Sequence, residues 1–120
     1  MNPIVKVIGA PTMTVRGRRS GLPIATPLSP FEFEGARYLV GGGGETHWAR
    51  NLRAAGVGRL RAGGKNMDFR AVEIHGAERD RIVTAYRDFM GRRALSYFVA
   101  LPLPADHPVF RVEPTESGRL

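Results

Sequence analysis

Two arginines and a serine stand together on a short stretch bounded by glycines, Gly17-Arg18-Arg19-Ser20-Gly21. Arginine presents paired donors to phosphate oxygens, and the backbone amides of a tight turn form a nest that binds anions. These residue types on one turn therefore suit a phosphate group. Taken alone, the pentapeptide is more typical of a solvated basic turn, so its interpretation depends on the rest of the chain.

Four consecutive glycines, Gly41, Gly42, Gly43 and Gly44, follow the apolar stretch 38–40. Where side chains are missing, a flat ligand can lie directly against the backbone. A flexible loop is the alternative explanation. The segment is not a Walker loop, because the required spacing and the terminal Lys-Ser/Thr pair are missing.

A short helix is predicted directly after these glycines, with Thr46 as its cap and Gly56 marking its end. Trp48 and Leu52 lie one turn apart, a spacing typical of core residues. Asn51 lies on another face, where its side chain either reaches a ligand or faces water.

The elements that position these residues follow from the apolar pattern. Alternation and turn glycines predict strands at 12–16, from about 22, at 31–34, 38–40, 57–62, 67–74 and 109–112. A longer helix is expected to pack on the sheet through Ile82, Val83, Tyr86, Phe89 and Met90. Residues 94–101 form a short helix or a loop. Antiparallel hairpins with helices at the edge favour a small barrel over a βαβ sandwich.

One strand has an irregular apolar pattern. Its apolar residues shift from Met67, Phe69 and Ala71 to Val72 and Ile74. This shift indicates either a bulge or a strand that is buried on both faces.

The composition fits one soluble domain over residues 1–120, with 42% hydrophobic and 24% charged residues. No apolar run approaches the roughly 20 residues that span a bilayer, so we expect no integral membrane segment. The apolar run within 1–10 is too short for a secretory signal, and there is no cysteine. We therefore expect a cytoplasmic protein.

The formal net charge of +7 favours anionic partners. Nucleic acid, an anionic membrane surface and a small molecule with phosphate and carboxylate groups all satisfy this condition. Charge alone does not choose among them.

Taken together, three segments resemble the deazaflavin (F420)-dependent nitroreductase family, the F420H2-dependent quinone reductases of actinobacteria. They are the basic turn followed by Thr26-Pro27-Leu28, the glycine segment after a strand, and a W-x-x-N-L pattern at 48–52. The closing stretch 108–114 is similar to the last strand of the family. The resemblance covers about residues 12–114, and the combination is far more specific than any single part.

The resemblance implies a mainly β (α+β) split β-barrel of the FMN-binding type, with about six antiparallel strands and two or three helices. It also implies F420 as the cofactor. Position by position, Arg18, Arg19 and Ser20 would contact the phosphate-bearing tail, and Thr26 and Pro27 would line the groove. The ring would lie beside Gly41, Gly42, Gly43 and Gly44, with Trp48 and Asn51 closing that end.

The implied activity is hydride transfer from F420H2 to a small electron-poor substrate, such as a quinone, a nitroaromatic or an activated alkene. Such chemistry needs no protein nucleophile, because the cofactor carries it. Tyr97 is the candidate proton donor, and simple packing beside Phe98 is its alternative role. The alternative functions are an FMN-binding split barrel, a non-catalytic F420 carrier and a basic nucleic-acid-binding module.

The three histidines, His47, His75 and His107, have no metal-like spacing, so we expect no metal. His75 is expected at the surface and His107 in a structural role. We expect a small-molecule substrate rather than nucleic acid as partner, and a homodimer is compatible with this type of barrel.

Overall fold

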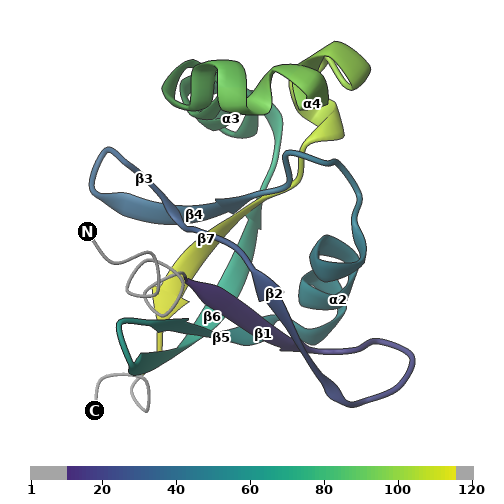
Figure 1. The fold of residues 1–120 in the computed structure, drawn as a ribbon, viewed down its shortest axis with the longest axis vertical. Helices are drawn as coiled ribbons and strands as arrows, with labels where there is room; N and C mark the ends of the chain where they lie inside the picture. Colours follow the sequence, from purple (N-terminus) through teal and green to yellow (C-terminus); the bar gives the residue numbers. More distant parts are fainter. Residues whose placement is uncertain (1–10, 116–120) are drawn as a thin grey trace, which may run out of the picture.

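The computed structural model describes residues 11–115, which fold into one curled antiparallel sheet with helices on its two sides (Figure 1). The strands are β1 (Thr12–Arg16), β2 (Pro23–Pro27), β3 (Phe31–Phe33), β4 (Ala36–Val40), β5 (Val57–Ala62), β6 (Lys65–Ile74) and β7 (Val109–Pro114). The helices are α2 (His47–Ala55), α3 (Gly76–Met90) and α4 (Leu95–Ala100), with short 3-10 turns η1 (Gly91–Ala94) and η2 (Pro104–Asp106). The prediction made for residues 1–10 lies outside the described residues.

The seven strands are arranged in the order β2-β1-β5-β6-β7-β4-β3, and the α+β split-barrel fold class predicted from the sequence is confirmed. The seven strands correspond to the seven segments predicted from the apolar pattern, one more than the about six that the family resemblance implies, and residues 31–40 form a complete hairpin. Glu34 and Gly35 both have positive φ, 51° and 81°, which is typical of the tight two-residue turn that joins antiparallel strands. Gly63 and Gly64 (φ 58° and 78°) make the same kind of turn between β5 and β6.

The sheet is buried on both faces along its centre. In β6, Phe69 belongs to a core under α2, whereas Ile74 belongs to a second core under α3 and α4. Successive side chains of a strand point to opposite faces, so the odd-numbered and even-numbered apolar residues serve different cores. The pairing of β6 with β5 and β7 keeps one register throughout. The shift in its apolar pattern therefore reflects burial on both faces, and the bulge interpretation is wrong.

Each core pairs strand residues with residues of its own helix. The first joins α2 to one face of the sheet through Met13, Val15, Leu39, Ala49, Leu52, Leu60, Phe69, Phe110 and Val112. The second joins α3 and α4 to the other face through Phe31, Tyr38, Val40, Ile74, Ile82, Val83, Ala94, Phe98 and Val109. Within residues 11–115, no helix is long and apolar enough to cross a bilayer.

The helix in the ambiguous stretch 94–101 is present as α4, which follows α3 after one 3-10 turn. Of the residues predicted to pack α3 on the sheet, Ile82 and Val83 are buried. Phe89 is 65% exposed and covers the ring of Phe31 at 5.5 Å between centroids. The two helical layers thus lie on opposite sides of the sheet, and the glycine segment 41–44 connects β4 to α2 between them (Figure 1).

Candidate cofactor-binding site

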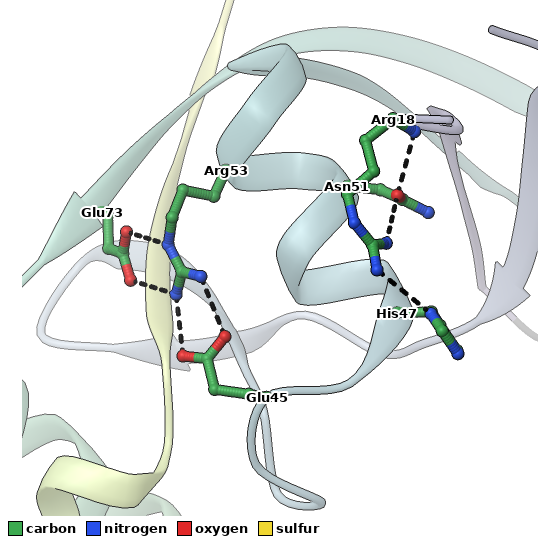
Figure 2. Close-up of polar contacts among 6 residues, drawn as sticks. All are labelled: Arg18, Glu45, His47, Asn51, Arg53 and Glu73. Atoms are coloured by element: carbon green, nitrogen blue, oxygen red, sulfur yellow. Dashed lines mark hydrogen bonds and ion pairs between the residues drawn. The ribbon is translucent and has the colours of Figure 1, made fainter. Parts of the chain in front are cut away.

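Helix α2 organises the site. It ends at Gly56, whose left-handed backbone (φ 75°) lets its N–H donate to the carbonyl of Leu52 at 2.8 Å. Ala49 and Leu52 are fully buried against the sheet, so the orientation of the helix about its axis is fixed by the first core. The remaining faces of α2 point toward the basic turn on one side and toward the glycine segment and β6 on the other (Figure 2).

The basic turn docks on α2 through Asn51. The backbone N–H of Arg18 and its Nη1 both donate to Oδ1 of Asn51, at 3.0 and 2.8 Å. Nη2 of Arg18 also lies 3.5 Å from Nδ1 of His47, one turn earlier on the helix (Figure 2). Asn51 is only 2% exposed. The structure therefore brings Arg18, His47 and Asn51 together, although the sequence left open whether Asn51 faces water.

The turn itself is held by its own side chains. A Cβ on Gly17 would lie 2.7 Å from Oγ of Ser20, so a larger residue at position 17 would have to displace the Ser20 side chain. That hydroxyl accepts a hydrogen bond from the N–H of Leu22 at 3.2 Å. Arg19 is exposed and has no hydrogen bond or ion pair within the part of the chain that the structure describes. The guanidinium of Arg19 is thus available to bind an anion, whereas part of the guanidinium of Arg18 is already hydrogen-bonded to Asn51.

The glycine segment is covered by the chain's own side chains on one side. A Cβ on Gly42 would lie 3.1 Å from the ring of Tyr97, and one on Gly44 would lie 2.8 Å from Cδ1 of Leu101. Gly44 also has φ +86°, a conformation that favours glycine. Close packing against Tyr97 and Leu101, together with the positive φ of Gly44, therefore accounts for Gly42 and Gly44.

The end of the site where the glycines meet α2 carries unsatisfied donors. Thr46 stands at the cap position of α2, yet its side chain makes no capping bond. Its Oγ1 is buried and has no hydrogen-bond partner among residues 11–115. The first amides of a helix also lack intrahelical partners and carry partial positive charge. A buried hydroxyl without a partner, free helix amides and the nearby Arg18 guanidinium form a donor set that fits a polyanionic cofactor.

An ion-pair network on the other side of α2 was not predicted from the sequence. Arg53 donates to both carboxylate oxygens of Glu45 at 2.8 and 2.9 Å, and to both of Glu73 at 2.8 Å (Figure 2). The hydrogen bond from Arg53, opposed by partial burial, lowers the pKa of Glu45, and the same carboxylates raise the pKa of Arg53. The network ties the end of the glycine segment to α2 and β6. No sequence spacing signals it, because Glu73 lies 20 residues from Arg53.

Two tyrosines lie over the glycine segment. Tyr97 is 46% exposed, and its ring approaches Gly42 and Gly43. The hydroxyl of Tyr86 would lie 3.5 Å from a Cβ on Gly42. Burial, together with the neighbouring Tyr97, raises the pKa of Tyr86, so its phenol stays protonated at neutral pH. Tyr86 therefore joins Tyr97 as a candidate proton donor at this position, although its helical spacing marked it only as a packing residue.

Three predicted residues, Trp48, Thr26 and Pro27, have no described contact with the basic turn or the glycine segment. Trp48 is partly buried, with its ring 6.2 Å from that of Phe110, so it packs on the first core. Thr26 and Pro27 pair with Met13 and Thr12, at the end of the hairpin opposite the basic turn. No described contact joins Thr26 or Pro27 to α2.

A cavity of about 650 Å3 opens beside the site. It lies where β1 parts from β5, because their pairing stops at Thr14 and Arg59. Its walls include Arg16 and Gly21 at the base of the basic turn. The glycines 41–44 do not line it, so this cavity borders the turn without joining it to the glycine segment.

The fold and the site together define a split-barrel protein of the flavin- and deazaflavin-binding type. The sequence profile of the F420H2-dependent quinone reductase family matches residues 5–97, and the chain belongs to this family. It is accordingly an F420-dependent oxidoreductase, with F420 as its cofactor. No curated protein sequence matches the chain significantly.

Solved structures agree with this assignment. The chain resembles an F420H2-dependent reductase, FDR-A, with 27% identity and a TM-score of 0.63 over 88% of this chain and 94% of that one. It is equally similar to a structure described as a domain-swapped dimer, with 27% identity and a TM-score of 0.63 over 88% of this chain and 80% of that one. HutZ, a haem storage protein from Vibrio cholerae, shares the fold alone, at 11% identity and a TM-score of 0.64 over 96% of this chain and 90% of that one.

Proposed function

We propose that this chain uses F420H2 to reduce a small electron-poor organic molecule, such as a quinone, a nitroaromatic or an activated alkene. The observation that carries the proposal is that the basic turn and the glycine segment both adjoin the short helix α2, the turn through Asn51 and the glycine segment through the cap residue Thr46. When bound, F420H2 supplies a hydride. The chain's own residues bind and orient both reactants and deliver a proton.

The binding roles follow from the donor set. Arg19 and the uncommitted donors of Arg18 would hold the phosphate-bearing tail, with Ser20 shaping the turn. Thr46 and the first amides of α2 would meet the polar part of the cofactor next to the glycines. The ion pairs of Arg53 with Glu45 and Glu73 tie the end of the glycine segment to α2 and β6. The glycine segment would therefore already have its binding conformation before the cofactor binds.

The proton would come from one of the two tyrosines over the glycines. Tyr97 is the more accessible, whereas Tyr86 is half-buried with a raised pKa. Replacing each by Phe separates them, because loss of a proton donor lowers kcat and leaves F420 affinity unchanged. A Tyr97→Phe variant with full kcat would assign that residue to packing.

The direct test is turnover. F420H2 should be oxidised in the presence of the protein and a soluble quinone, a nitroaromatic or an activated alkene, each assayed separately. The Arg18→Gln/Arg19→Gln double variant should lose most of this rate, and Arg61→Gln is the matched control because it removes an exposed arginine from β5. If F420 binds and none of the three acceptor classes is reduced, the protein is a carrier of the cofactor.

Two binding alternatives are separated by titration. If the cofactor is FMN, the protein should bind FMN in place of F420. The Arg18→Gln/Arg19→Gln variant should then bind FMN more weakly than the wild-type protein does. A nucleic-acid-binding protein would bind duplex DNA tightly and would not bind F420. We expect F420 affinity to fall with added salt, because exposed charges are screened within about 10 Å at 0.1 M salt.

We further propose that the chain assembles as a homodimer. Leu95 and Val99 lie one turn apart on α4 and are 59% and 72% exposed, which leaves an apolar stripe in contact with water. The related structure described as a domain-swapped dimer supports this proposal. Light scattering on the protein and on a Leu95→Ser/Val99→Ser variant tests it, and a monomeric wild-type protein would contradict it.

A further inference from the structure

The cavity beside the basic turn lies where two neighbouring strands separate. The pairing of β1 with β5 ends at Thr14 and Arg59, although β1 continues to Arg16 and β5 begins at Val57. Each strand keeps the pairing with its other neighbour, β2 or β6, up to that end. The cavity of about 650 Å3 therefore lies between two intact hairpins. Its volume is within the range of about 300–1,000 Å3 that is typical of small-molecule sites.

The cavity offers apolar surface at its base and at its rim. Val15 and Phe69, which are buried members of the first core, close its base. At the rim, Val57 is 55% exposed, and Pro23 is also exposed. A Cβ on Gly58 would lie 2.8 Å from the ring of Phe69, so the wall between the base and the rim is backbone without a side chain. An apolar group that covered Val57 and Pro23 would remove their surface from water, which is favourable.

The walls also carry one guanidinium without a carboxylate partner. Arg59 and Asp68 bind each other, with Nε 2.6 Å from Oδ1 and Nη2 3.2 Å from Oδ2. Arg16 forms no ion pair within residues 11–115, and its contact with the carbonyl oxygen of Gly21 is long, at 3.5 Å. Two arginines and one aspartate give the lining a net charge of +1. The unpaired positive charge is therefore that of Arg16.

We propose that this cavity binds a small carboxylate with a ring-sized apolar part. Arginine presents two parallel N–H donors whose spacing matches a carboxylate, and one negative charge balances the net charge of the walls. The carboxylate would bind to Arg16, and the apolar part would lie over Val57 and Pro23.

This site is separate from the proposed cofactor site. The described lining of the cavity includes neither Arg18 nor Arg19 nor the glycines 41–44. A ligand in the cavity would thus leave the donors proposed for F420 free. The inference therefore goes beyond the proposed function and does not rest on it.

The test is a titration of the full chain with 2-naphthoate, followed by the backbone amide signals in NMR spectra. The signals of Arg16, Val57 and Gly58 should shift and reach saturation. Two control probes divide the ligand into its parts, because 2-naphthylmethanol keeps the ring without the charge and acetate keeps the charge without the ring. Each control should bind at least about tenfold more weakly, since each lacks either the charged hydrogen bond or the buried apolar area.

Three variants assign the contacts. Arg16→Gln should weaken naphthoate binding about tenfold, because it removes a charged hydrogen bond. Arg61→Gln is the matched control, since it removes an exposed arginine of β5 that does not line the cavity. Val57→Thr keeps the shape of the side chain and removes one apolar group, so binding should weaken about fourfold. Both altered lining residues are exposed, and unchanged amide signals outside the cavity verify that each variant is folded.

The outcomes keep this site and the proposed function apart. The absence of saturable shifts at millimolar 2-naphthoate overturns the site, and so does equal binding of the naphthoate and the alcohol. Unchanged affinity in both Arg16→Gln and Val57→Thr overturns it as well. Displacement of the naphthoate by F420 would place the cofactor in this cavity and overturn the separate site. A protein that binds naphthoate at these residues and does not bind F420 supports the site and refutes the proposed function.

Discussion

Replacing Asn51 by Ala should detach the basic turn from α2. The amide oxygen of Asn51 accepts two hydrogen bonds from Arg18, a residue 33 positions earlier in the chain. Within residues 11–115, the longer contact of Arg18 with His47 is the one further hydrogen bond that joins residues 17–22 to the helix. Removal of this one acceptor therefore leaves a backbone N–H and a guanidinium without their partner.

The expected cost follows from the type of each bond. A neutral hydrogen bond contributes about 1 kcal/mol to stability, and one with a charged partner about 1.5–3 kcal/mol. Because Arg18 is only partly buried, water replaces part of what is lost. We expect the free energy of unfolding to fall by about 2–3 kcal/mol, and the melting temperature by about 10 °C for a chain of this size.

A double-mutant cycle with Arg18→Met divides this cost between the two bonds. Arg18→Met keeps the backbone N–H and removes the guanidinium, so the coupling energy reports the side-chain bond and should be about 1–2 kcal/mol. Urea denaturation gives the four stabilities. Hydrogen exchange should show the amide of Arg18 protected in the wild type and exposed in Asn51→Ala, while Asn51→Asp, which keeps the acceptor, should retain protection. A loss below about 0.5 kcal/mol with zero coupling would refute this account of the docked turn.

Three further perturbations have definite expected results. Arg19→Gln should weaken F420 binding about tenfold with an unchanged melting temperature, since the side chain is exposed and a charged hydrogen bond contributes about 1.5–3 kcal/mol; a comparable drop in stability would contradict this. Glu45→Gln should cost about 0.5–1 kcal/mol at neutral pH. The hydrogen bond from Arg53 lowers the pKa of Glu45 in the folded state, so this stabilisation disappears as pH falls through that pKa. The denaturation midpoints of the wild-type protein and the Glu45→Gln variant should therefore converge in acid. A difference between the two midpoints that stays constant with pH would exclude the ion pair as its cause. Gly44→Ala should destabilise more than Gly64→Ala, because both have positive φ but only the former meets a neighbouring atom, at 2.8 Å; equal melting temperatures would rule out the packing argument.

Much of the fold was predictable because its signals are local. The first strand, Thr12–Arg16, and the helix ending before Gly56 have the bounds expected from alternation and capping. The same reasoning fell short in β6, where two partner helices on opposite faces impose two apolar patterns on one strand. Sequence periodicity indicates which residues are buried. Only the tertiary structure shows which helix or strand each of them packs against.

The site was predictable in its parts and unpredictable in its contacts. The basic turn and the glycine segment stood out because unusual residue types cluster in them. The contact between Arg18 and Asn51 could not be predicted, because the two residues lie 33 positions apart and no local pattern in the sequence links them. The bridge from Arg53 to Glu45 and Glu73 and the burial of His107 likewise depend on long-range packing.

The most direct test of the central claim is a crystal structure of the protein soaked with F420. The account predicts that the phosphate-bearing tail lies against Arg18 and Arg19 and that the ring lies beside residues 41–44, next to Thr46. Density for F420 in the cavity between β1 and β5, lined by Arg16 and Gly21, with the glycine segment untouched, would contradict it.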